Sequence, residues 1–450
     1  MHSRNKNCIK PYKKNPMYWQ YKGEPVLLLG GSDEDNLFQW TGSQLTEHLE
    51  LLCSVGGNYV RNVMSDRDKG NVFPFMQVKG NRYDLMQWNE EYWNRFDNFL
   101  TETNKQQIFV QIELWDAFDW HGVNWERSPW NPKNNINYTY QESGLPQTIP
   151  SSPHHAVHPF VLTIPGLSNG ESEAVVLPYQ RRFAQRVMEV SLRYDHVLYC
   201  IHNETSASQN WSDYWAQFIH DEAKARGLTA YVSDMRERDR LTARPDPQQY
   251  QIERPELYTY LDVCKSNRSA LGQDHWDEVQ LIRTRLKECH PRPMNVVKLM
   301  QRHFPQQASV DRWWRNLFGG IAAIRFHRPG NGLGLTQSAQ ILIKGARVFT
   351  DQMNIFACEP HNDLLDDRGP DEAYCMAEQG KQYAVYFPSG GSVNLDLSAI
   401  KGKLVVRWLS IKRGCWTKEE EIMAKPMLTL ATPGDEGWAV LILNAEKNTP

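Results

Sequence analysis

The sequence lacks any apolar run that approaches the ~20 residues of a membrane-spanning helix. It also lacks an excess of one charge, because 50 Lys and Arg residues stand against 53 Asp and Glu residues and leave a formal net charge of −3. This balance gives no electrostatic reason to expect nucleic acid or an acidic membrane as a partner. The eight cysteines are scattered singly, without C-x-x-C pairs. A disulfide framework is therefore not indicated, and we expect a reducing compartment.

Several nucleotide, hydrolase and metal motifs are missing as well. No G-x-G-x-x-G or Walker sequence follows a strand-like run, which argues against a nucleotide-binding fold. No G-x-S-x-G elbow, H-E-x-x-H pair or Ser-His-Asp order supports acyl transfer or zinc-protease chemistry. The segment HHAVH spaces His154, His155 and His158 as a metal site could, but it lies in a Pro-rich stretch with no recognisable fourth ligand. We therefore expect neither a metal nor a cofactor.

The N-terminal residues MHSRNKNCIKPYKKNP are basic and polar and contain no apolar core of a signal peptide. This predicts either a cytoplasmic protein or a periplasmic or secreted one that has already lost its signal.

Aromatic residues, by contrast, are abundant: the 450 residues include 16 Trp, 19 Tyr and 16 Phe. An excess of tryptophan must lie in a core, an interface or a ligand cleft. Flat apolar rings with one polar group suit sugar rings as well as they suit cores. With 40% hydrophobic and 23% charged residues, the composition indicates a globular enzyme or binding protein.

A regular series of strand-length apolar runs fills the first three quarters of the chain. Segments with helical periodicity separate most of these runs, which predicts a parallel sheet buried on both faces. Eight such units over about 330 residues fit a (β/α)8 barrel with insertions, in residues 1–351, better than an open doubly wound sheet. The eight expected strands are residues 25–31, 56–64, 106–115, 196–204, 228–235, 257–264, 293–300 and 319–329.

From about Gln352 the helical periodicity disappears and short alternating runs take over, such as QYAVYFP, SVNLDLS and WAVLIL. Their spacing and the turn sequences PSGGS, KGK and PGDEG predict a small antiparallel β-sandwich in residues 352–450. We expect this second domain to brace the barrel.

In a parallel barrel the active site lies at the C-terminal ends of the strands. Nearly every predicted strand ends in a polar or charged residue. The opposite, structural end of a barrel would not require such residues, so their presence indicates an active site. Paired carboxylates in an aromatic cleft are what glycoside hydrolysis needs, because one protonates the leaving oxygen and the other attacks the anomeric carbon or activates water. The candidate catalytic residues are Glu204, Asp234, Asp262 and Glu113, and the candidate substrate-binding residues are Asn203, Asn36, Arg61, Trp115, Asp116, Trp120, Lys298, Arg325 and His327.

At the end of the fourth strand, Asn203-Glu204 resembles the Asn-Glu pair of clan A glycoside hydrolases, in which the Glu is the general acid/base. The resemblance extends to the opening NPMYWQYKGEPVLLLGGSDEDNLFQW, which is similar to the start of the bacterial apiosidase-like branch, where the strand after N-P-x-Y enters the barrel directly. It also includes the segment EAYCMAEQGKQYAVYFPSGGSVNLDLS, which resembles the collagen-binding-type β-sandwich that follows such barrels. The resemblance implies a glycosidase without a cofactor, acting on a plant or algal oligo- or polysaccharide.

One position departs from the resemblance. Retaining members of the clan carry a nucleophilic Glu at the end of the seventh strand, where this sequence reads NVVKLM and has Lys298. The partner of Glu204 is then expected from another strand, with Asp234 ahead of Asp262 and Glu113. The alternatives are a shifted strand register or a degenerate site that binds carbohydrate without cleaving it. A polysaccharide lyase with Lys298 or His327 as base is a third possibility.

The cations Arg61, Lys298, Arg325 and His327 fall near the same predicted mouth, together with Arg328. They would bind a uronate or sulfate on the sugar, or they would balance the carboxylates of the protein itself. The tryptophans after the third strand have two interpretations as well. Trp115, Trp120, Trp125 and Trp130 would form a stacking platform for sugar rings or an irregular cap on the rim of the barrel.

Overall fold

The computed structural model describes residues 8–149, 159–167, 171–204, 207–236, 247–264, 270–300 and 305–445. Within these residues, eight parallel strands form one sheet in the order β10-β9-β8-β5-β4-β13-β12-β11. The strands in chain order are β4 (Leu28–Gly31), β5 (Tyr59–Val63), β8 (Phe109–Asp116), β9 (Val197–Asn203), β10 (Val232–Ser233), β11 (Leu261–Asp262), β12 (Met294–Leu299) and β13 (Ala323–Phe326). Each lies inside one of the predicted runs, except that β8 extends one residue beyond its run, to Asp116, so the predicted barrel strands are confirmed.

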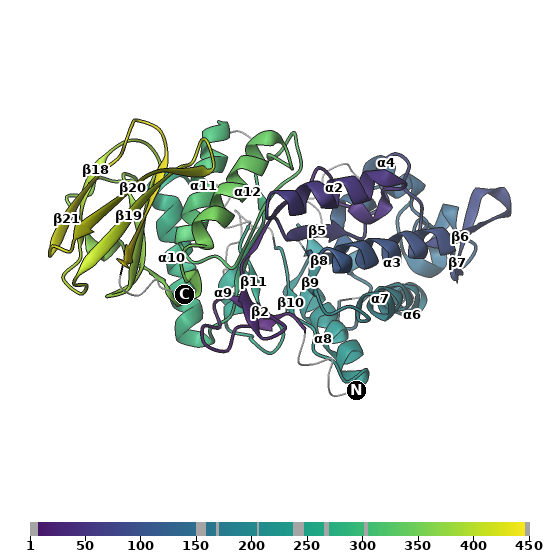
Figure 1. Ribbon diagram of the computed structural model, residues 1–450. Coiled ribbons are helices and arrows are strands. Elements are labelled where there is room, and N and C mark those ends of the chain that lie inside the picture. The colour runs from purple at the N-terminus through teal and green to yellow at the C-terminus, as the bar shows by residue number, and fades with distance from the viewer. Residues whose placement is uncertain are drawn as a thin grey trace.

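The barrel closes between β10 and β11, where loop contacts replace a regular ladder. The Thr259 backbone N–H donates to the Val232 carbonyl at 2.8 Å, and the Asp262 N–H donates to Ser233 Oγ at 2.8 Å. The helices that follow the strands are α2 (Ser43–Ser54), α3 (Glu90–Lys105), α7 (Leu177–Ser191), α8 (Gln209–Ala225), α9 (Pro247–Ile252), α10 (Gly272–Cys289), α11 (Gln306–Phe318) and α12 (Gln337–Thr350). Figure 1 shows these helices around the sheet. Among the described residues, no helix combines the length and hydropathy that crossing a membrane requires.

The N-terminal segment differs from the expectation that a strand enters the barrel directly. A three-stranded antiparallel sheet comes first, made of β1 (Lys10–Pro11), β2 (Trp19–Tyr21) and β3 (Glu24–Val26). Lys22 and Gly23 have φ angles of 53° and 97°, the left-handed conformation that a two-residue hairpin turn needs. The small sheet is fixed to the barrel by the indole of Trp19, which donates to Asn295 Oδ1 at 3.0 Å.

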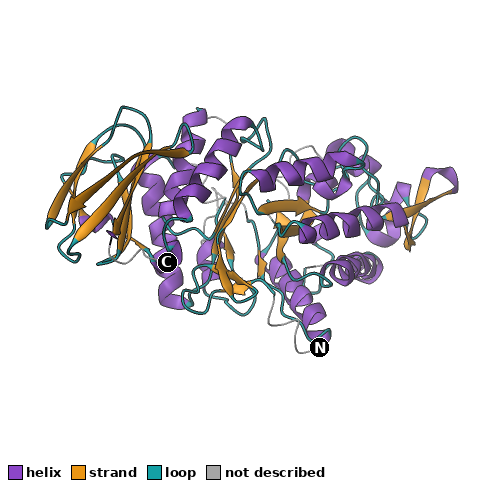
Figure 2. Ribbon diagram, viewed as in Figure 1, coloured by secondary structure: helices purple, strands orange, loops and turns teal. Residues whose placement is uncertain are grey.

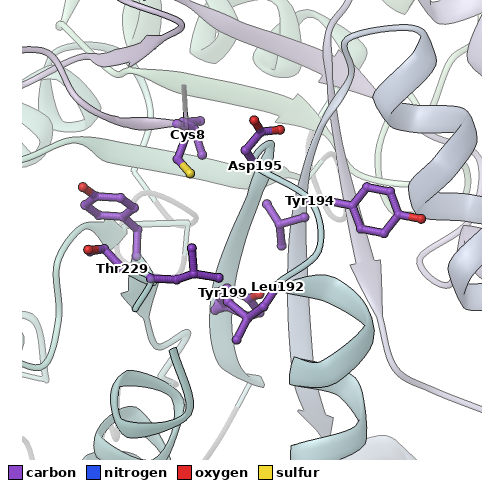
Figure 3. Close-up of a pocket in the computed structure, with 10 residues that line it drawn as sticks. Cys8, Leu192, Tyr194, Asp195, Tyr199 and Thr229 are labelled. Carbon is purple, nitrogen blue, oxygen red and sulfur yellow. The ribbon is translucent and has the colours of Figure 1, made fainter. Parts of the chain in front are cut away.

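A small pocket lies beside this segment, at the N-terminal ends of β9 and β10. Figure 3 shows Cys8, Asp195, Tyr199 and Thr229 around it, with the chain before β9 along one side. It is at the opposite end of β9 from Asn203, the residue that ends the strand, so it is separate from the candidate site described below.

Two insertions extend from the C-terminal ends of the strands. After β5 comes a hairpin of β6 (Phe75–Val78) and β7 (Arg82–Trp88), which sequence periodicity did not indicate and which projects from the barrel in Figure 1. After β8 comes the predicted long loop, with the short helices α4 (Gly122–Arg127), α5 (Tyr140–Ser143) and α6 (Glu171–Val175). The HHAVH segment of this loop, with its three histidines, lies outside the described residues.

The C-terminal region forms the predicted antiparallel β-sandwich (Figure 2). In the described part of the chain, its larger sheet has the order β14-β16-β17-β22-β19-β20 and its smaller sheet the order β15-β18-β21. The bounds are β14 (Glu359–Pro360), β15 (Leu365–Asp366), β16 (Tyr374–Glu378), β17 (Gln382–Phe387), β18 (Ser392–Asp396), β19 (Lys403–Ser410), β20 (Cys415–Met423), β21 (Met427–Ala431) and β22 (Trp438–Asn444). Its inner faces bury a separate core that includes Val385, Trp408 and Ile442.

The outer face of the larger sheet packs on the barrel helices. Tyr386 of β17 stacks on Trp314 of α11 with ring centroids 6.0 Å apart, and Tyr374 of β16 lies 4.8 Å from Trp276 of α10. Arg315 of α11 donates to Asp371 at 2.9 Å. This aromatic contact supports the prediction that the sandwich braces the barrel.

Deleting residues 352–450 is expected to make the barrel aggregate or to lower its thermal stability clearly, because Trp276 and Trp314 would lose their cover. Burying a large aromatic side chain contributes roughly 1.5–3 kcal/mol. Solubility after expression and a thermal melt of the purified fragment measure the effect. A monomeric fragment that melts at the temperature of the full chain would show instead that the sandwich is an independent module.

Candidate active site

Strand β9 ends at Asn203, and Glu204 follows it directly at the C-terminal face of the barrel. Glu204 has a φ of 57°, a left-handed conformation that costs a non-glycine residue of order 1–3 kcal/mol and is retained at sites where the surroundings impose it. Its side chain is 9% exposed. The strand therefore delivers a buried, conformationally constrained carboxylate to the face where barrel enzymes carry out their chemistry.

Lys298, near the end of β12, contacts this pair from across the barrel. Its ammonium donates to Glu204 Oε1 at 2.5 Å and also to Asn203 Oδ1. The Lys298 side chain is 3% exposed, so the ion pair is buried. The structure thus brings together three of the predicted site residues, and it places a lysine where the resemblance implied a nucleophilic carboxylate.

The amide of Asn203 is held on its other side by Asp116, which ends β8. Asn203 Nδ2 donates to Asp116 Oδ1 at 3.0 Å, and the Phe118 N–H donates to the same oxygen at 3.0 Å. Asp116 Oδ2 accepts from the guanidinium of Arg67, which the loop after β5 supplies. These contacts fix which end of the Asn203 amide faces Lys298.

A second ion-pair cluster joins β5, β8 and the loop after β4. Arg61 Nε donates to Glu113 Oε1 at 2.5 Å, Nη2 donates to Glu113 Oε2 at 2.6 Å, and Nη1 donates to Asp35 Oδ1. Arg61 and Glu113 have side-chain exposures of 0%. Glu113 uses both carboxylate oxygens on one guanidinium, an arrangement that positions an arginine but leaves little for a reaction.

Asp35 is the carboxylate at the centre of this cluster. Burial alone would raise its pKa, but the cations Arg61, Arg325 and Lys298 together hold the pKa well below its usual value. His327 Nδ1 lies 3.4 Å from Asp35 Oδ1, and burial lowers the pKa of His327 well below its usual value against the pull of Asp35. Asp35 is therefore ionised and His327 neutral over the ordinary pH range.

The buried guanidinium of Arg325 binds groups of the protein itself. Its guanidinium donates to the Val297 carbonyl at 2.9 Å and to Ser32 Oγ, and its side chain is 0% exposed. Burial lowers the pKa of Arg325 to about 10, partly offset by Asp35. Arg61 and Arg325 thus meet groups of the protein itself, which is the second of the two interpretations for these cations.

Two of the proposed partner carboxylates lie apart from the Glu204–Lys298 contact. Asp234 accepts from Ser212 Oγ of α8 at 2.5 Å and lies 3.7 Å from Arg236, and burial raises its pKa to about 6. Asp262 accepts from Gln111 at 3.0 Å, in register with Asn295, three residues before Lys298 on β12. Burial also raises the pKa of Asp262.

The aromatic residues after β8 are packed into the loop. Trp115 is 3% exposed and lies 5.0 Å from Trp215 of α8 between ring centroids. Trp120 is 2% exposed, 4.3 Å from Phe160 and 5.3 Å from His202. In this structure both rings therefore present no open face for a sugar, and sugar stacking at these tryptophans stays a prediction.

Sequence reasoning missed part of the network. Asn36, which was predicted as a binding residue, donates to the Ser65 carbonyl at 3.3 Å, whereas its neighbour Asp35 carries the charge. Arg67 and Asp119 were missed as well. Only the acidic runs SDED after the first strand and SDRD after the second could have indicated this region.

Among the described residues, no group of three or more His, Cys, Asp or Glu side chains is placed to hold a metal ion. The carboxylates meet arginine, lysine, amide and hydroxyl groups, and side chains in such contacts can transfer protons and form hydrogen bonds.

Comparison with known proteins shows where this fold recurs. Residues 360–444 match a family model described as "Putative collagen-binding domain of a collagenase", and no curated protein matches the chain. A glycoside hydrolase family 5 structure from Bacteroides vulgatus ATCC 8482 is similar with a TM-score of 0.65 and 13% identity, over 98% of this chain and 93% of that one. A structure titled "Glycoside hydrolase" has a TM-score of 0.64 and 11% identity, with 98% of each chain covered.

A third structure, an endo-1,4-beta-mannanase from Rhizomucor miehei, has a TM-score of 0.53 and 11% identity, over 77% of this chain and all of that one. At these identities the likeness concerns the fold. The chain is a (β/α)8 barrel followed by a β-sandwich, and the first two structures share this architecture over nearly their whole length.

Proposed function

We propose that the protein is a glycoside hydrolase that acts on an oligo- or polysaccharide, with Glu204 as the general acid/base. The observation that carries the proposal is the buried Asn203-Glu204 pair at the C-terminal end of the fourth barrel strand. The fold is consistent with it, because solved structures of similar fold are titled glycoside hydrolases. Apiosidase-like specificity is a narrower hypothesis within this proposal, based on the resemblance of the N-terminal sequence.

Glycoside hydrolysis needs an acid and an ionised carboxylate. In the proposal, Glu204 gives its proton to the leaving oxygen, and Asp35 supplies the ionised partner in place of Asp234, Asp262 or Glu113. Asp35 is suited to this role because the Lys298 ammonium that contacts Glu204 also lowers the pKa of Asp35. An ammonium favours the ionised form of a carboxylate beside it. We therefore expect the enzyme to work at acidic pH, where Glu204 can carry the proton that it donates.

Replacing Asp35 with Asn is expected to abolish turnover and to lower the free energy of unfolding at neutral pH by about 3–5 kcal/mol, because Arg61 loses a buried partner. The folded-state pKa of Asp35 is depressed, so this contribution is present above the unfolded pKa and fades as pH falls. Urea unfolding at several pH values measures it, with Asp33→Asn on the same loop as control. Equal losses at acidic and neutral pH would contradict the ionised role of Asp35.

The paired arginines favour neutral sugars over uronate-containing or sulfated ones. Arg61 and Arg325 are fully buried, and Arg328 pairs with Glu34 at 3.1 Å. An anionic substrate would have to displace a carboxylate of the protein from one of these cations.

A second candidate function is carbohydrate binding without cleavage. Lys298 at the end of the seventh strand favours it, because the lysine neutralises Glu204 where a retaining glycosidase needs a nucleophile. Such a protein would retain a sugar and release no product.

The test is a panel of neutral, uronate-containing and sulfated oligosaccharides, assayed for reducing-sugar release and, by calorimetry, for binding. Release of reducing ends supports the hydrolase, and the responsive substrate identifies the sugar class. Binding without release would favour the second candidate. A product that absorbs in the near ultraviolet would indicate a lyase instead.

A further inference from the structure

The loop after β5 reaches the candidate acid/base through an unbroken series of side-chain contacts. Arg67 donates to Asp116, Asp116 accepts from Asn203 at 3.0 Å, and Asn203 accepts from Lys298. Lys298 in turn donates to Glu204 at 2.5 Å. One continuous series of hydrogen bonds therefore connects three barrel strands and one loop.

Asp116 and Lys298 in this series are buried and Arg67 is largely buried, so each has little freedom to choose another partner. Asp116 has a side-chain exposure of 0%, Arg67 of 11% and Lys298 of 3%. Arg67 is further held by Ser65 Oγ at 2.9 Å and lies over the ring of Phe118 at 5.6 Å. A buried polar network with satisfied partners fixes the orientation of its members.

Several carboxylates lie near the Arg67 guanidinium. Asp119 lies 3.6 Å from Arg67, and burial, with Asp116 and Asp66 nearby, raises the pKa of Asp119 well above its usual value. Burial also raises the pKa of Asp66, to about 7, against the effect of Arg67. Arg67 Nη1 donates to Asp116 but lies 3.6 Å from Asp119, so Asp116 is the carboxylate that receives the hydrogen bond. The titratable and charged groups around the contact are Asp35, Arg61, Asp66, Asp68, Asp119, Arg127 and His202.

We infer that Arg67 is a positioning residue: through Asp116 it sets the orientation of the Asn203 amide, and thereby holds Lys298 against Glu204. The expected effect of Arg67 on catalysis rests on the proposed function. Its effect on the orientation of Asn203 and Lys298 does not. If Arg67 is lost, Asp116 becomes a buried carboxylate without its guanidinium partner, and its Oδ2 needs another hydrogen-bond donor. Asn203 then loses its fixed acceptor, and Lys298 loses its second partner.

The test compares Arg67→Met with the double variant Arg67→Met, Asp116→Asn, because a neutral amide at position 116 no longer needs the guanidinium. Arg127→Met is the matched control, since Arg127 also lies beside Asp66 but donates to the Arg67 carbonyl and to Asn124 instead. We expect Arg67→Met to lower kcat about tenfold or more with KM nearly unchanged and to shift the pH profile of kcat. The double variant should recover much of the loss. A purely structural arginine would give additive losses and an unshifted profile.

Arg67→Met with the kcat and pH profile of Arg127→Met would overturn the inference, and the hydrolase proposal would stand if Glu204→Gln were inactive in the same assay. If the wild-type protein turns over no substrate, the hydrolase proposal fails, and thermal unfolding decides the inference. Losses in Tm for Arg67→Met and Asn203→Ala should then sum to more than the loss of their double variant, because both break one line of contacts. Additive losses would overturn the inference.

Discussion

Replacing Glu204 with Gln is expected to lower kcat on the responsive substrate by about 10²–10⁴-fold, the usual contribution of a general acid/base. Glutamine keeps the shape of the side chain and its ability to accept a hydrogen bond, but it has no proton to give to the leaving oxygen. Steady-state kinetics measure the loss, and Glu222→Gln, on the outer helix α8 with a surface partner in Arg226, is the matched control.

The variant leaves the Lys298 ammonium buried without a counter-charge, so a loss of folding must be separated from a loss of chemistry. The double variant Glu204→Gln, Lys298→Met removes both charges, and we expect it to fold with near-wild-type stability and to remain inactive. Hydrolysis by the folded double variant at the wild-type rate would remove Glu204 from the mechanism.

Replacing Lys298 with Met is the second change with a large expected effect. The Glu204 carboxylate would stay buried but lose the ammonium at 2.5 Å. Breaking a buried ion pair by removing one partner costs about 3–5 kcal/mol. In the variant, burial favours the neutral carboxyl, so the loss of stability should be greatest at high pH and should shrink as pH falls through the range where Glu204 becomes protonated.

The same change should extend proton donation to higher pH. We expect the pH optimum of hydrolysis to rise by about one unit or more, since one unit corresponds to about 1.4 kcal/mol of differential interaction. Rate profiles and urea unfolding between acidic and alkaline pH measure both effects. Lys287→Met is the control, because Lys287 pairs with Glu359 on the partly exposed surface at 3.1 Å. If the pH optimum and the stability stay at the wild-type values, the ion pair with Lys298 does not control the protonation of Glu204.

The barrel was predictable because its signal is local. Each strand buried on both faces appears as a continuous apolar run, and each outer helix repeats with the 3.6-residue period of one buried face. The change to alternating runs after Gln352 marked the sandwich for the same reason, since period-two patterns belong to sheets with two unlike faces. The β6–β7 hairpin escaped because its alternation is weak: in β7 only Leu85 is buried.

The candidate site was only partly predictable. Strand ends identified Asn203, Glu204 and Lys298, because the chain order of the strands fixes which residues reach the C-terminal face. The carboxylate that acts with Glu204 could not be predicted in this way. Asp234 directly follows a strand, as Glu204 does, and Glu113 lies three residues before the end of β8. Asp234, however, accepts from Ser212 on α8, and Glu113 accepts from Nε and Nη2 of Arg61.

The sequence by itself determined the two domains, the barrel, and the residues that its strands carry to one face, because periodicity and strand order are properties of the chain. Only the tertiary structure decided which charges meet. Lys298 and Glu204 are 94 residues apart in sequence, and Asp35 and His327 are nearly 300 apart. Whether such groups pair, and which carboxylate stays ionised, depends on burial and on distances of a few ångströms that no local pattern encodes.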